Sequence, residues 1–167
     1  MKIYIIGPSG SGKTTLSKKL SNKYNIPSFE LDCIVYDDQN NHRKRTPKEI
    51  EKLFNQILKK DSWIIEDVGR DKFNKGLKEC DKIYYLKIPK RIIYKRVIYR
   101  FIKQKLGKEK YNYPPTIHQF YDMIRVAKLY YKHEKNKLKK IEKYNKKVIF
   151  ITNKQLNNME ELWNINV

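Results

Sequence analysis

Short apolar runs alternate with longer amphipathic segments along this chain. Five runs are rich in β-branched and aromatic residues, and they span 2–6, 28–32, 63–65, 83–88 and 147–151. Runs of this length and composition predict buried strands. The first run ends at Gly7 and the fourth is stopped by Pro89, two residue types that commonly terminate a strand.

The segments between these runs predict helices. The clearest begins after Thr46, an N-cap residue followed by Pro47 at the first helical position and Glu49 at the third. Apolar residues then recur at helical spacing from Ile50 to Leu58. Further helices are expected at 13–25, through 93–103, at 118–144 as one long helix, and at 159–163.

This order of elements indicates a fold class. Strands that alternate with helices imply right-handed crossovers and a mostly parallel sheet. We therefore predict an α/β fold in which a five-stranded sheet is covered by helices on both faces. The chain contains no internal repeat and no low-complexity linker, so residues 1–167 are expected to form a single domain.

The net charge is strongly positive, because 38 basic residues face 18 acidic ones, which gives +20. Such a field attracts polyanions, including nucleotides and nucleic acids. A second explanation is that Lys, Ile and Asn, all abundant here, have AT-rich codons, so the basicity would reflect genome composition. Both explanations stay open, and the seven arginines are the more informative cations because they bind phosphate with a planar fork.

The cellular setting is expected to be the cytoplasm. The longest fully apolar runs are about four residues, far below the roughly 18 that cross a membrane, so no membrane partner is expected. The two cysteines, Cys33 and Cys80, lack the spacing of a metal site and fit a reducing compartment.

The strongest motif is GPSGSGKT at residues 7–14, which fits G-x-x-x-x-G-K-[ST] in full between a predicted strand and a predicted helix. It predicts a P-loop NTPase fold. Lys13 is expected to bridge the β- and γ-phosphates of ATP, and the Thr14 hydroxyl to hold Mg²⁺. The residues expected to bind the phosphates are Gly7, Pro8, Ser9, Gly10, Ser11, Gly12, Lys13, Thr14 and Thr15.

Missing motifs narrow the class of P-loop protein. A GTPase would carry N-K-x-D, but Asn153-Lys154-Gln155 is followed by Leu156. The D-x-x-G switch motif of GTPases is also missing, because position 66 is Glu66. The L-S-G-G-Q signature of transporter ATPases is absent as well. Ring-forming ATPases need a longer chain. Elimination favours a small kinase.

Nearly the whole chain resembles the adenylate-kinase-like group of P-loop kinases. Within that group, WIIEDVGR at 63–70 and the run 89–107 resemble the DNA topology modulation proteins. The resemblance implies that Glu66 is the family's acid and that Arg70 is its arginine four residues later, which is expected to bind the acceptor. It also implies that Arg96 and Arg100 act on the phosphates. The presumed lid, at 103–116, is short and contains no arginine, which argues against adenylate kinase activity proper.

Other candidates follow the predicted strands and helices. Asp32 ends the second strand and could orient the acceptor or a metal-bound water, although a solvated aspartate would look the same. Glu66 or Asp67 is expected to partner Mg²⁺, with Glu66 favoured. Arg43 and Arg45 could read the acceptor, and Arg125 could reach the phosphates from the long helix; ordinary surface roles compete with each of these.

Together these features predict an ATP- and Mg²⁺-dependent phosphotransferase with an unidentified small acceptor. Lys13, Asp32, Glu66, Arg96 and Arg100 are its expected catalytic residues. The alternative is a nucleotide-gated protein that associates with nucleic acid and modulates DNA topology with little turnover. Non-specific nucleic-acid binding through the basic surface is compatible with either function.

Overall fold

The computed structural model describes residues 1–37, 43–108, 115–144 and 147–158. Its centre is a sheet of five parallel strands in the order β2-β5-β1-β6-β7. These strands are β1 (Lys2–Ile6), β2 (Ser28–Glu30), β5 (Trp63–Asp67), β6 (Lys82–Lys87) and β7 (Val148–Thr152). The predicted α/β fold with a five-stranded parallel sheet is therefore confirmed.

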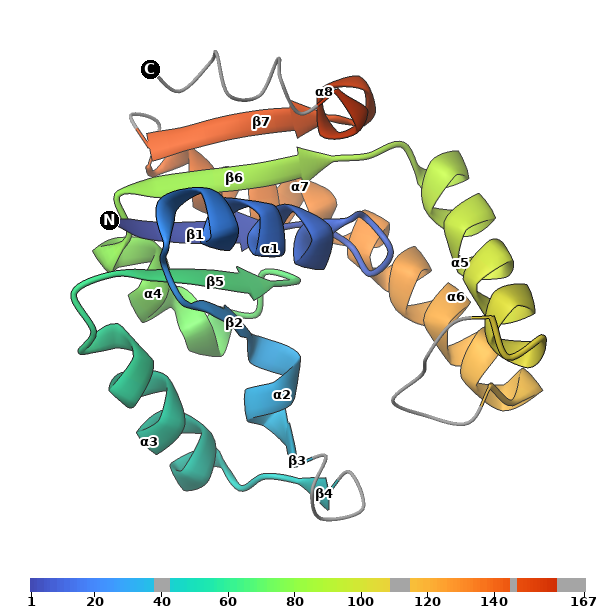
Figure 1. The fold of residues 1–167 in the computed structure, drawn as a ribbon, viewed down its shortest axis with the longest axis horizontal. Helices are drawn as coiled ribbons and strands as arrows, with labels where there is room; N and C mark the ends of the chain where they lie inside the picture. The colour runs from blue at the N-terminus through green and yellow to red at the C-terminus, as the bar shows by residue number, and fades with distance from the viewer. Residues whose placement is uncertain (38–42, 109–114, 145–146, 159–167) are drawn as a thin grey trace.

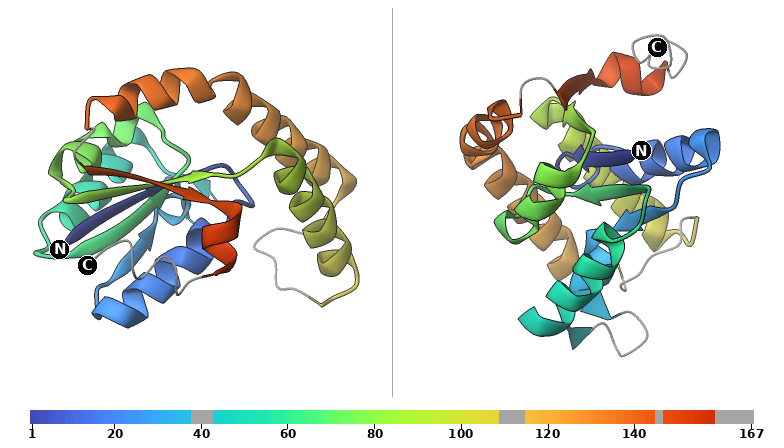
Figure 2. Two further views of the ribbon diagram at one scale, coloured as in Figure 1. Left: turned by 90° about the horizontal axis from the view of Figure 1, so that it is seen from above. Right: turned by 90° about the vertical axis from the view of Figure 1, so that its left-hand side faces the viewer.

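Helices cover both faces of this sheet, as Figure 2 shows from above and from the side. One face carries α1 (Lys13–Tyr24), and the hydrophobic cluster on that side extends to residues of α5 (Lys90–Lys105) and α6 (Ile117–Lys132). The other carries α3 (Pro47–Leu58), α4 (Asn74–Glu79) and α7 (Glu134–Glu142). The remaining elements are α2 (Leu31–Val35), β3 (Tyr36–Asp37), β4 (Arg43–Lys44), the 3₁₀ turn η1 (Asp71–Phe73) and α8 (Asn153–Asn157).

The side chains of the central strand β1 point alternately into two hydrophobic cores. Ile3 and Ile5 of β1 face the cluster that includes α1, whereas Tyr4 and Ile6 face the cluster that includes α3 and α4. All four side chains are buried. Because a strand covered on both faces needs no polar side chain, β1 is a continuous apolar run.

The predicted capping box at the start of α3 is present. The Glu49 carboxylate accepts a hydrogen bond of 2.7 Å from the Thr46 amide, and the Glu49 amide donates to the Thr46 hydroxyl. These two bonds satisfy amides that have no partner within the helix.

The second strand is shorter than predicted. It pairs with β5 only over Ser28–Glu30, and Asp32 lies in the short helix α2. The reason is the spacing of Leu31, Ile34 and Val35, which are all buried. Buried residues at intervals of three and four belong on one side of a helix, and they end the strand.

The predicted single helix over 118–144 is wrong, because α6 and α7 meet at His133. There the backbone leaves helical geometry, with φ −103° and ψ 9°. The two halves pack on different partners: α6 lies against α5, and α7 covers the sheet through Ile141. Figure 1 shows α5 and α6 projecting as an arm beyond the carboxyl ends of the strands.

Some sequence-based predictions fall outside the described residues. Of the expected lid at 103–116, residues 103–105 continue α5, and 109–114 are not described. The expected helix at 159–163 also lies outside them. No helix within the described ranges is long and apolar enough to span a membrane.

Candidate functional site

The loop between β1 and α1 has a backbone that only its glycines permit. Gly10 and Gly12 have φ of 77° and 99°, values in the left-handed region that side-chain-bearing residues rarely adopt. A Cβ on Gly7 would lie 2.7 Å from the Ser11 hydroxyl and 2.9 Å from Leu86. The loop therefore folds tightly over the end of the sheet.

The start of α1 is suited to an anion. Gly12 is its N-cap, no side chain caps the helix, and its first turn contains no acidic residue. The first amides of a helix have no partner within it and carry the positive end of the helix dipole. Phosphate oxygens would satisfy these donors.

Two side chains at the start of α1 supply complementary groups. The Lys13 ammonium donates to the Pro8 carbonyl over 3.0 Å, so it lies across the loop. The Thr14 hydroxyl donates to Glu66 Oε2 over 3.0 Å. A lysine and a hydroxyl–carboxylate pair at this position are what a magnesium-bound triphosphate needs, so the residues fit ATP with Mg²⁺. Thr15 is exposed on α1.

The sheet register separates the roles of Glu66 and Asp67. Glu66 lies beside Ile5 of β1, on the face that α1 covers, whereas Asp67 lies beside Ile6 and faces the other core. Successive side chains of a strand point to opposite faces, so only one of two adjacent carboxylates reaches the phosphate loop. In this structure it is Glu66.

Asp67 has a different task from the expected metal binding. It is buried, and its Oδ2 accepts from the amides of Gly69 and Arg70 over 2.8 and 2.6 Å. Its Oδ1 accepts from Arg70 Nε. The carboxylate thus shapes the loop after β5 and orients Arg70, and its oxygens are occupied by these bonds.

Arg70 also joins the two sides of the site. Its Nη2 donates to Asp32 Oδ1 over 2.8 Å, which links the loop after β5 to α2. The Asp32 side chain is 53% exposed, so it stays accessible to an acceptor while Arg70 fixes its position. The expected pairing of Asp32 and Arg70 with the acceptor is compatible with this placement.

Carboxylates surround the Lys13 ammonium. Glu30 is the register partner of Glu66 on the neighbouring strand. Burial, and then the charge of Glu30, raises the pKa of Glu66 to about 7. Burial likewise raises the pKa of Glu30 and lowers the pKa of Lys13, although the carboxylates partly oppose the shift of Lys13. The site thus has acidic groups that a cation would deprotonate fully.

Arg96 reaches the phosphate loop from α5. Its Nη1 donates to the Ser11 carbonyl over 3.0 Å and to the Gly10 carbonyl over 3.4 Å. Its Nη2 donates to Asn153 Oδ1 over 2.8 Å. The guanidinium therefore bridges the loop and α8, where it can meet phosphate oxygens.

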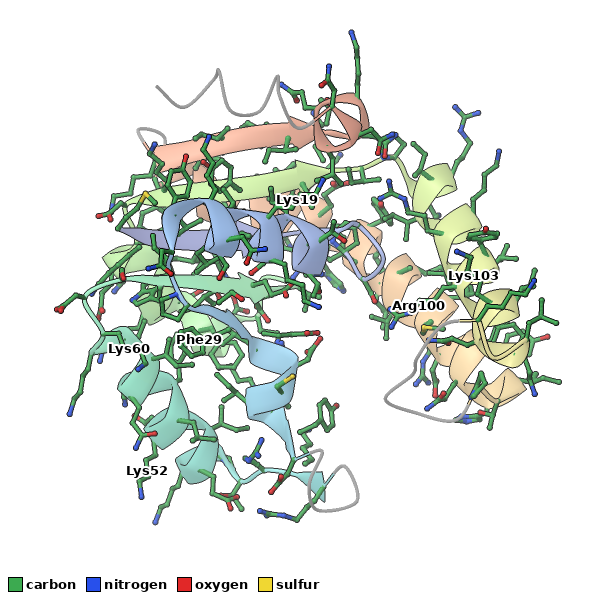
Figure 3. The ribbon with its side chains drawn as sticks, viewed as in Figure 1. Lys19, Phe29, Lys52, Lys60, Arg100 and Lys103 are labelled. Carbon is green, nitrogen blue, oxygen red and sulfur yellow. The ribbon has the colours of Figure 1, made fainter. Side chains whose placement is uncertain are left out.

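Arg100 and Arg125 lie on the projecting arm. Arg100 is exposed one turn beyond Arg96, and Figure 3 shows it on α5 with Lys103. Its charge still lowers the pKa of Glu30 against the larger effect of burial. Arg125 is 72% exposed and pairs with Asp122 of its own helix, so this conformation gives it the surface role and not the expected contact with phosphates.

Arg43 and Arg45 stabilise local structure. The Arg43 guanidinium bonds both oxygens of Glu49, at 3.3 and 2.8 Å. Arg45 Nη1 donates to the carbonyls of Cys33 and Tyr36, and its Nη2 pairs with Asp37. Arg45 thereby satisfies the end of α2, and this arrangement leaves its expected contact with the acceptor without support.

Glu30, Asn153 and Leu156 belong to the site but were not among the sequence-based candidates. Glu30 ends β2, and Asn153 directly follows β7. Leu156 would lie 2.8 Å from a Cβ on Gly12, so it covers the loop. Ligands of parallel α/β sheets gather at the carboxyl ends of the strands, and applying that rule to every strand would have found the first two.

Sequence comparison places this chain among P-loop proteins. The AAA domain family matches residues 3–110. An adenylate kinase of Buchnera aphidicola subsp. Cinara cedri is 30% identical over 191 residues, covering 90% of this chain and 88% of that protein. An adenylate kinase of Rickettsia africae is 24% identical over 172 residues, covering 86% of this chain and 81% of that protein.

Solved structures show the same fold at low identity. The crystal structure of shikimate kinase from Bacteroides thetaiotaomicron covers 98% of both chains, with a TM-score of 0.54 and 16% identity. A gluconokinase from Sinorhizobium meliloti covers 99% of this chain and 97% of its own, with a TM-score of 0.50 and 10% identity.

Proposed function

This chain belongs to the AAA domain family and is a P-loop kinase related to the adenylate kinases. We therefore propose that it transfers the γ-phosphate of ATP to a small acceptor. The observation that carries the proposal is the group formed by Lys13, Thr14 and Glu66 at the uncapped start of α1. It provides a phosphate cradle, a cation and a metal partner within one turn of helix and one strand end.

Thr14 and Glu66 are the residues that would hold Mg²⁺. When bound there, the ion would neutralise negative charge on the phosphate oxygens. The Thr14 hydroxyl now donates to Glu66, so it would turn its lone pair toward the ion, and the Glu66 carboxylate would lose the proton that burial favours.

Transfer needs positioning and charge stabilisation more than covalent chemistry by the protein. The acceptor oxygen forms a bond to the γ-phosphorus while the bond to the bridging oxygen breaks and ADP leaves. Lys13 and Arg96, both in contact with loop carbonyls, would move onto phosphate oxygens and stabilise this charge. Asp32 would orient the acceptor and receive its proton where the acceptor is a hydroxyl.

Acceptor-dependent formation of ADP tests this proposal. Purified protein with ATP and Mg²⁺ is screened against nucleoside monophosphates, nucleosides, sugars, sugar acids and other hydroxylated metabolites. We expect at least one acceptor to raise ADP formation well above the rate with water alone, and a new phosphorus-31 signal to appear in the product. Lys13→Ala should abolish both signals. Equal ADP formation with every acceptor and with water would contradict a kinase.

A further inference from the structure

A pocket of about 380 Å³ lies beside the phosphate loop, on the side of the loop after β5. Ser9 of the phosphate loop forms one end of it, and Val68 and Gly69 line it from the loop after β5. Asp71 of η1 also lines it, and the end of α6 and the start of α7 supply the other lining residues, on both sides of the break at His133. The break in the helix is therefore what brings two helices to one pocket.

One lysine of the lining is bonded to a backbone carbonyl instead of a carboxylate. Lys140 pairs with Asp71 over 2.8 Å. Lys137 instead donates to the Gly69 carbonyl over 3.0 Å and lies over the ring of Tyr130. Within the described residues the Lys137 ammonium forms no direct ion pair, although the charges of Asp67 and Asp71 partly offset the lowering of its pKa by burial.

The same pocket has an exposed apolar wall. Val126 and Leu129 of α6 are 46% and 49% exposed and lie next to the buried Tyr130. The Tyr130 hydroxyl donates to the Tyr85 hydroxyl over 3.1 Å, and Tyr85 donates to Glu134 over 3.3 Å. This chain of bonds fixes the junction of α6 and α7, so the wall and Lys137 have fixed relative positions.

Gly69 keeps the space in front of Lys137 open. Its φ of 84° is in the left-handed region, and a Cβ there would lie 3.4 Å from Lys137 Nζ. Any larger residue would fill the position that a ligand group would take. The Lys137 ammonium, an apolar wall and Ser9 of the phosphate loop thus surround one small volume.

We propose that this pocket binds the anionic end of the phosphate acceptor, with Lys137 as its counter-charge. The acceptor is then a small molecule that carries a carboxylate or a phosphate monoester in addition to the oxygen that is phosphorylated. Its apolar or ring portion would lie against Val126 and Leu129. The volume suits a molecule of metabolite size. This inference rests on the proposed kinase function, because the pocket gains that role only beside a bound triphosphate.

The test compares pairs of probes that differ only in the anionic group. Gluconate is compared with sorbitol, and adenosine monophosphate with adenosine, so the carboxylate and phosphate sources are separated. Binding is measured by calorimetry and by thermal shift with a non-hydrolysable ATP analogue and Mg²⁺. We expect one anion to bind at least tenfold more tightly than the neutral compound with which it is paired. Lys137→Met should remove that difference and Lys137→Arg should retain it.

Lys139→Met is the matched control, because Lys139 is exposed on α7 and outside the pocket lining. It should keep the preference for the anion. If Lys137→Met folds poorly, Lys137→Gln replaces it in the same assay. The inference is overturned if neither anion binds better than the neutral compound with which it is paired, or if the preference survives removal of the ammonium.

The binding assay also separates this inference from the kinase proposal. Phosphorylation of neutral acceptors alone would leave the kinase proposal intact and overturn the pocket assignment. Anion binding that depends on Lys137, without ADP formation from any acceptor, would support the pocket and contradict the kinase.

Discussion

The Thr14 hydroxyl donates a 3.0 Å hydrogen bond to the Glu66 carboxylate and so connects the phosphate loop to the end of β5. This bond joins residues 52 positions apart and places a buried carboxylate at the presumed metal position.

Glu66 should make stability depend on pH in the absence of nucleotide. Its pKa is raised from 4.5 to about 7, so the folded protein favours the protonated form. The contribution of the protonated Glu66 to the free energy of unfolding is fully present below pH 4.5 and is lost as pH rises to about 7. We would measure the free energy of unfolding in urea for wild type and Glu66→Gln at pH 5 and at pH 8. The difference, variant minus wild type, should be more positive at pH 8 than at pH 5 by roughly 1–3 kcal/mol.

Glu51→Gln, which removes a carboxylate from the exposed side of α3, is the control for loss of one charge. A Glu66→Gln difference that is the same at both pH values would show that burial does not perturb this carboxylate.

Substitution of Asp67 should mainly lower stability, whereas substitution of Asp32 should mainly lower the rate of phosphoryl transfer. Asp67→Asn removes a buried charge that accepts from two amides and from Arg70, so a loss of about 3 kcal/mol in unfolding free energy is expected. Asp32→Asn removes one exposed contact and should cost less than about 1 kcal/mol. The rate of transfer by Asp32→Asn should nevertheless fall about 100-fold.

Urea unfolding and initial rates at saturating ATP measure both variants. Equal losses of stability in the two variants would contradict the distinction between a structural Asp67 and a functional Asp32.

The sequence located the groups of this site that depend on neighbours along the chain. The phosphate loop and the Thr46–Glu49 capping box are set by residues within one turn, and both are present. The choice between Glu66 and Asp67 depended on which face of β5 meets α1, which the sheet register decides. The contact of Arg96 with Asn153 joins residues 57 positions apart, and no local pattern encodes it.

The break in the predicted long helix and the contacts of Arg45 both depend on tertiary packing. The lysine-rich segment after Tyr131 keeps a helical composition through His133, but α6 and α7 bury their faces against different elements. Arg45 resembled a phosphate reader in the sequence, yet the carbonyls at the end of α2 need its donors. Tertiary packing decided both outcomes.

The effect of Arg96 on phosphoryl transfer should depend on the planar guanidinium and not on positive charge alone. Arg96→Lys cannot bond two loop carbonyls and Asn153 together, so we expect transfer to fall tenfold to 100-fold. ATP affinity should stay within about threefold, because the loop amides and Lys13 remain. Arg91→Lys, at the exposed start of the same helix, is the control. Unchanged turnover in Arg96→Lys would reduce Arg96 to a surface charge.

Nucleic-acid binding should be a by-product of charge. Basic residues are scattered over distant elements, and Figure 3 shows Lys19 on α1, Lys52 on α3, Lys60 just after α3, and Lys103 on α5. Retention on DNA should therefore fall steeply with salt, show no sequence preference and ignore ATP. Binding titrations from low salt to about 150 mM measure this. Tight binding at the upper salt that changes with ATP would instead favour the nucleic-acid-associated alternative.

Calorimetric titration of Mg²⁺-ATP into wild-type protein and Lys13→Ala tests the central claim most directly. Lys13 lies on the phosphate loop, so its removal should cost affinity without unfolding the chain. We expect wild type to bind Mg²⁺-ATP with one site and a clear enthalpy, and Lys13→Ala to bind at least tenfold more weakly with an unchanged melting temperature in the absence of nucleotide. Equal affinity in the two proteins, or no binding to wild type at millimolar ATP, would contradict the assignment of the phosphate site.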